Sequence, residues 1–73
     1  MAADNYLLDI GPLILERARE AKQRERKGED PFEQGSVTAF YTVLSLMRQQ
    51  AVAFGLNDEA IGLKGVNLEE ELL

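Results

Sequence analysis

Carboxylates are the main candidates for chemistry in this chain, because its 73 residues include neither histidine nor cysteine. The absence of histidine and cysteine excludes the common hydrolytic triads, cysteine nucleophiles and the histidine-containing zinc motifs. Glu16 and Glu20 lie one helical turn apart and could share a carboxylate site. Arginines surround both residues, as is typical of a solvated helical face, so we interpret the pair as surface residues.

A second acidic group is the triplet Glu69, Glu70 and Glu71. Carboxylates attract divalent cations, but side chains at adjacent helical positions point in different directions. The fragment 62–65, Gly-Leu-Lys-Gly, lacks the spacing and the strand–turn–helix context of a phosphate-binding loop, so we interpret it as a connector. The sequence predicts a non-enzymatic protein with no catalytic residues, no cofactor and no metal site.

Basic residues are concentrated in one segment, 16–27, although the net charge of the whole chain is −5. A basic helix can follow phosphates by releasing their counter-ions, so a small nucleic-acid-binding regulator is our alternative function. The segment has no aromatic side chain to stack on bases, and it carries three glutamates, so nucleic acid is not the partner we favour. The residues of this alternative are Arg17, Arg19, Lys22, Arg24, Arg26 and Lys27.

Helical periodicity predicts an all-α fold in one domain, 1–73, with an antiparallel hairpin as its main feature. The first helix is expected at about 12–27, with Pro12 in its first turn and a separate short turn at 4–10 before it. A single helix kinked at Gly11-Pro12 is the alternative. Gly28 fits the left-handed residue that ends a helix.

The second helix is predicted at about 31–54, with Asp30 as its N-cap, Glu33 in its first turn and Gly55 after its end. A connection of about three residues forces the two helices to lie antiparallel. Two short elements follow. Asn57 is expected to cap a short helix at 58–61, and Asn67 a final turn at 68–72.

The second helix carries more apolar surface than one hairpin partner can cover. Its apolar residues form two stripes: Val37, Phe40, Leu44, Met47, Ala51 and Phe54 in one, and Phe32, Ala39, Val43, Leu46 and Ala53 in the other. So small a domain buries only about 60% of its unfolded surface, and its composition excludes disulfides. We therefore expect a homodimer or higher homo-oligomer, with two hairpins stacked into a four-helix bundle.

The predicted oligomer interface consists of Val37, Phe40, Tyr41, Val43, Leu44, Met47, Ala51 and Phe54. Arg48 is expected either to fix the register of the dimer, with Asp9 as its partner, or to point into solvent. The first residues lack the basic start of a signal peptide, and polar and helix-breaking residues interrupt the apolar run 6–15. The sequence thus predicts a cytoplasmic protein outside the membrane that acts by protein–protein interaction, and no motif specifies its biological role.

Overall fold

The computed structural model of the chain describes residues 2–28 and 31–73, and side chains from residue 5 onward within them. The described residues form two long helices, α1 (Ala2–Lys27) and α2 (Phe32–Ala53), and two short ones, η1 (Asp58–Ile61) and α3 (Leu68–Leu72). No strand occurs among them. The prediction of an all-α hairpin with short C-terminal helical elements is confirmed.

The helix ends agree with the capping residues of the sequence. Gly28 has φ 67°, in the left-handed region where a side chain would be strained, and α1 ends just before it. The side-chain oxygens of Asn57 and Asn67 accept hydrogen bonds of 3.0 Å from the backbone N–H groups of Ala60 and Glu70. The two short C-terminal elements are therefore confirmed with their caps.

The start of α2 differs from the prediction. The predicted cap, Asp30, lies outside the described residues, and α2 begins at Phe32, directly after Pro31. Glu33 lies in the first turn, as predicted, and its carboxylate accepts a hydrogen bond of 2.9 Å from Nε of Arg24. Glu33 thus links α2 to α1 across the turn.

The separate turn predicted at 4–10 is wrong, because α1 continues without interruption through Pro12. A proline inside a helix removes one hydrogen bond and costs roughly 3 kcal/mol, so tertiary contacts must offset this cost. The contacts are made by η1 and the residue after it. A Cβ added to Gly11 would lie 1.8 Å from the carbonyl oxygen of Ile61, and one added to Gly62 would lie 2.5 Å from Cδ of Pro12. The C-terminal segment therefore docks on α1 at Gly11-Pro12. The alternative prediction, a single helix that runs through Gly11-Pro12, describes the structure.

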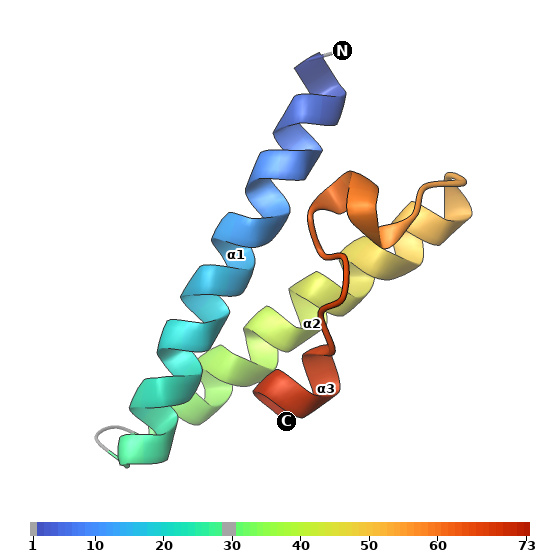
Figure 1. The fold of residues 1–73 in the computed structure, drawn as a ribbon. Coiled ribbons are helices and arrows are strands. Elements are labelled where there is room, and N and C mark those ends of the chain that lie inside the picture. The colour runs from blue at the N-terminus through green and yellow to red at the C-terminus, as the bar shows by residue number, and fades with distance from the viewer. Residues whose placement is uncertain (1, 29–30) are drawn as a thin grey trace.

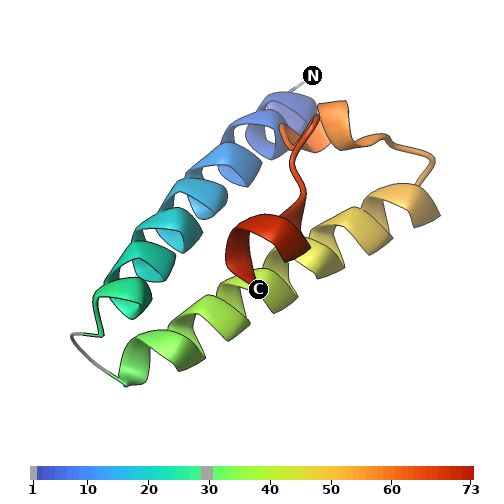
Figure 2. The same cartoon turned by 60° about the horizontal axis from the view of Figure 1, so that its bottom comes forward.

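The core lies between the hairpin and the C-terminal tail, residues 57–73. Both views show α1 and α2 close together at the turn and diverging from it, with the tail lying against one side of the pair (Figures 1 and 2). The buried apolar residues come from all three parts: Leu15, Ala18, Ala21, Val37, Leu44, Ala51, Ile61, Leu63, Leu68 and Leu72. The tail thus packs against a side of α2 that was predicted to contact a second chain.

Candidate functional site

The structure divides the eight residues predicted to form the interface into two groups. Val37, Leu44 and Ala51 follow one another at seven-residue spacing and are buried within the single chain. A second chain docking on this structure would therefore find these three already covered. Phe40 is half-buried against the same core, and Tyr41 is half-buried and donates a hydrogen bond of 3.0 Å to the carboxylate of Glu69 in α3. These two residues also serve the fold of the single chain.

The other three residues, Val43, Met47 and Phe54, line a groove of about 650 Å³ between α2, the N-terminal part of α1 and η1. Its lining is apolar except for Gln50, and the remaining contributors are Leu7, Leu46, Ala51, Leu56 and Ile61. Several of these side chains are open to water: Val43 is 45% exposed, Leu46 53% and Phe54 77%. Val43 and Leu46 belong to the second stripe and Phe54 to the first, so the exposed apolar surface includes residues of both stripes.

We call the exposed apolar surface beside this groove the open face, and it includes part of α1. In α1, Leu15 is buried, and Gly11 and Arg19 contact the tail. Positions two residues apart on a helix lie about 200° apart, so Leu13 and Arg17 point nearly away from the tail. The open face is defined by the exposed residues Tyr6, Leu13, Arg17, Ala39, Val43, Leu46, Gln50 and Phe54.

The α2 part of the open face carries no charge. Arg48 is the single charged residue between Gln34 and Asn57. It does not reach the open face, because its guanidinium lies against the tail. The hydroxyls of Thr38 and Thr42 donate hydrogen bonds of 3.0 and 2.9 Å to carbonyl oxygens one turn earlier in α2. Exposed helical faces of monomeric proteins are normally charged, so this composition is typical of a surface that another apolar surface covers.

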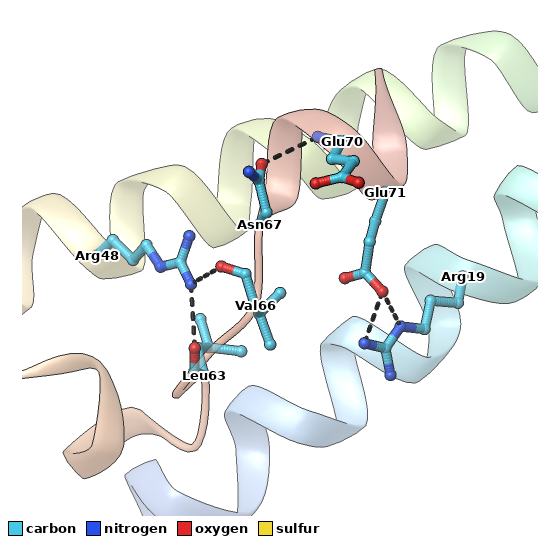
Figure 3. Close-up of polar contacts among 7 residues, drawn as sticks. All are labelled: Arg19, Arg48, Leu63, Val66, Asn67, Glu70 and Glu71. Carbon is cyan, nitrogen blue, oxygen red and sulfur yellow. Dashed lines mark hydrogen bonds and ion pairs between the residues drawn. The ribbon is translucent and has the colours of Figure 1, made fainter.

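Arg48 was expected to pair with Asp9 or to face solvent, and both interpretations are wrong. Its guanidinium donates hydrogen bonds to the backbone carbonyls of Leu63 and Val66, the first at 3.0 Å (Figure 3). Its Nε also lies 3.3 Å from a carboxylate oxygen of Asp58 in η1. Arg48 therefore holds the irregular part of the tail against α2. The carbonyls of Leu63 and Val66 lie outside any helix and accept no intrahelical hydrogen bond, so the guanidinium supplies donors for them.

Two carboxylates of α3 fasten the end of the tail to both long helices. Glu71 accepts hydrogen bonds of 2.8 and 3.0 Å from Arg19 of α1, as Figure 3 shows. Glu69 accepts the hydrogen bond from Tyr41 of α2. A backbone hydrogen bond at Glu69 and then the Tyr41 hydroxyl lower the pKa of its carboxyl, because both favour its charged form. Two of the three acids considered as metal ligands thus position the tail.

Half of the basic segment is engaged in ion pairs with carboxylates. Arg19 pairs with Glu71, Lys22 with Glu25 at 2.9 Å, and Arg24 with Glu33 at 2.9 Å. Phosphates would have to compete with these carboxylates for the same cations. The remaining members of the segment, Arg17, Arg26 and Lys27, are exposed. The geometry gives the nucleic-acid alternative no specific support.

Among the described residues, no three acidic side chains come together in a way that could hold a metal ion. In the same part of the chain, no helix combines the length and the apolar character needed to cross a bilayer. Neither the protein-family models, nor the curated proteins, nor the solved structures include a match to this chain.

Leu46 and Gln50 are the residues of this surface that the predicted interface lacked. The sequence signal that would have found them is the absence of charge along 34–57 together with the position of Arg48. Arg48 identifies the side of α2 that packs against the backbone carbonyls of the tail. The apolar residues on the opposite side of α2 are then expected to be exposed.

Proposed function

We propose that this protein is a non-enzymatic, self-associating helical protein that acts through protein–protein interaction, and that the open face is its oligomer interface. The observation that carries the proposal is the uncharged stripe of α2, in which Val43, Leu46 and Phe54 are all at least 45% exposed. Burying a leucine side chain contributes about 1.5–3 kcal/mol, so a few such residues supply much of the free energy of a stable contact.

The size of the chain supports the same proposal. A domain of 73 residues keeps a thin margin of stability, and the absence of cysteine leaves it without disulfides. A second copy presents the same uncharged apolar residues of α2. Contact between the two α2 surfaces therefore removes no charged group of α2 from water. Two hairpins joined by their open faces would form the four-helix bundle expected from the sequence.

The test is the mass of the protein in solution. At tens of micromolar, sedimentation equilibrium is expected to return a multiple of the 8.2 kDa chain mass. Leu46→Asp places a charge in the interface without touching the buried core, and we expect it to weaken association by about 3 kcal/mol or more, over a hundredfold in Kd. The matched control is Val52→Asp, because Val52 is 76% exposed on the same helix and does not line the groove.

Circular dichroism of the same samples separates dissociation from unfolding. The proposal predicts that Leu46→Asp remains helical while its mass falls to that of one chain, and that Val52→Asp keeps the mass of the wild type. A wild-type protein that sediments as a folded monomer at these concentrations contradicts the proposal. So does a Leu46→Asp variant that associates as strongly as the control.

A further inference from the structure

The open face distributes its charges unequally between the two long helices, and this asymmetry restricts how a second copy can cover it. Its α2 half is formed by Ala39, Val43, Leu46, Gln50 and Phe54, none of which is charged. Its α1 half carries Arg17, with Asp9 exposed eight residues earlier on the same helix. A partner must therefore bring an apolar surface to α2 and a carboxylate near Arg17.

Two face-to-face arrangements of identical hairpins satisfy two-fold symmetry. With the turns at the same end, α1 of each copy lies over α2 of the other, and Arg17 is buried against an uncharged stripe. A charge buried without a partner is costly, which disfavours this arrangement. With the turns at opposite ends, α2 lies over the partner's α2 and α1 over the partner's α1, so the uncharged halves cover each other.

On the basis of the proposed function, we infer that the occupant of the open face is a second copy with its turn at the opposite end, and that Arg17 of each copy lies beside the partner's Asp9. Leu13 of α1 and Leu46 of α2 lie about equally far from the turn along the chain. A two-fold axis passing near both leucines places Arg17 opposite the partner's Asp9 twice, once at each side of the axis.

Side-chain size supports the same axis. An axis between Leu46 and Met47 sets Val43 opposite the partner's Gln50 and Ala39 opposite the partner's Phe54. Phe54 is 77% exposed, and alanine is the smallest side chain on the α2 stripe. The largest exposed side chain of the stripe therefore meets its smallest residue, as interdigitated packing requires.

The dimensions of the chain allow an interface of standard size. The chain measures 41 by 20 Å along its two longer axes. An axis near Leu46 overlaps roughly four-fifths of that face, which is on the order of 650 Å² from each copy, or about 1,300 Å² in total. This value lies within the range of about 1,200–2,000 Å² for standard specific interfaces.

Cysteine cross-linking tests the arrangement directly, because the natural chain contains no thiol. Ala39→Cys and Phe54→Cys chains are mixed, oxidised gently and analysed by mass. We expect the mixed 39–54 disulfide and little linkage of either variant with itself. Positions 39 and 54 are fifteen residues apart, so each cysteine lies about 20 Å from the same residue of the partner chain. A disulfide needs Cα atoms within about 7 Å, so neither variant should link to itself. The matched control is Ala53→Cys mixed with Phe54→Cys, which is expected to give no efficient mixed disulfide.

Charge reversal tests the Arg17–Asp9 contact independently. Arg17→Asp and Asp9→Arg are each expected to raise Kd about fivefold or more, because each places two like charges side by side at both symmetric contacts. The double variant is expected to restore the Kd of the wild type. Arg26→Asp, which reverses an exposed charge outside the open face, is the control. A wild-type dimer without the 39–54 cross-link, or without rescue by the double reversal, overturns this arrangement and leaves the proposed function standing. A monomeric wild type overturns both.

Discussion

The contact between Gly11 and the tail predicts opposite effects for the same substitution in the two long helices. In Gly11→Ala the new Cβ would lie 1.8 Å from the carbonyl oxygen of Ile61, whereas ordinary contacts begin at 3.4 Å. The two backbones must therefore separate by about 1.5 Å, and no side-chain rotation can relieve the clash. In Gly35→Ala nothing lies within 4 Å of the new Cβ.

The magnitudes follow from two competing terms. Overpacking a well-filled contact costs about 1–3 kcal/mol, and a backbone-on-backbone clash belongs at the upper end. Replacing an interior helical glycine by alanine returns about 1 kcal/mol. We therefore expect Gly11→Ala to lower the free energy of unfolding by about 2 kcal/mol, which reduces Tm by about 10 °C in a domain of this size. Gly35→Ala is expected to raise the free energy of unfolding by about 0.5–1 kcal/mol.

Urea unfolding followed by circular dichroism measures both changes. All variants are compared at one protein concentration, because self-association makes apparent stability depend on concentration. Gly35→Ala controls for the helix propensity of alanine, and neither residue belongs to the open face as defined above. A Gly11→Ala protein as stable as the wild type would refute the close docking of η1 on α1, and with it our explanation of why α1 continues through Pro12.

Two further predictions concern the attachment of the tail. Arg48→Met keeps the unbranched apolar part of the side chain but removes the hydrogen bonds of the guanidinium to the carbonyls of Leu63 and Val66. We therefore expect the free energy of unfolding in urea to fall by about 1–2 kcal/mol. An unchanged midpoint would exclude Arg48 as a residue that holds the tail in place. For Glu69, an NMR titration is expected to give a carboxyl pKa below the usual 4.5. A carboxyl with a lowered pKa in the folded state contributes stability that is present above its unfolded pKa and is lost as pH falls through its folded pKa. This contribution therefore disappears only below about pH 4.5. Tyr41→Phe is expected to move the pKa of Glu69 upward, and a pKa that does not move would show that the hydroxyl leaves the carboxylate unaffected.

Local sequence rules predicted most of the elements but erred where tertiary contacts intervened. Asn57, Asn67 and Gly28 identified their helix ends because capping involves residues only a few positions apart. The prediction at Pro12 was wrong because the local cost of the proline was offset by packing of Gly11 and Pro12 against Ile61 and Gly62, some 50 residues away in sequence. Such a contact leaves no local pattern.

For the candidate surface, the sequence alone determined that α2 carries two apolar stripes and that Arg48 is the single charge along it. Only the tertiary structure decided which residues of these stripes are covered. That choice depends on the path of residues 57–73, where Leu63, Leu68 and Leu72 turn toward one side of the hairpin and leave Leu46 on the other. Periodicity reports which residues share a face of a helix, but the partner of that face is set by contacts between segments far apart in the chain, which a linear pattern does not contain.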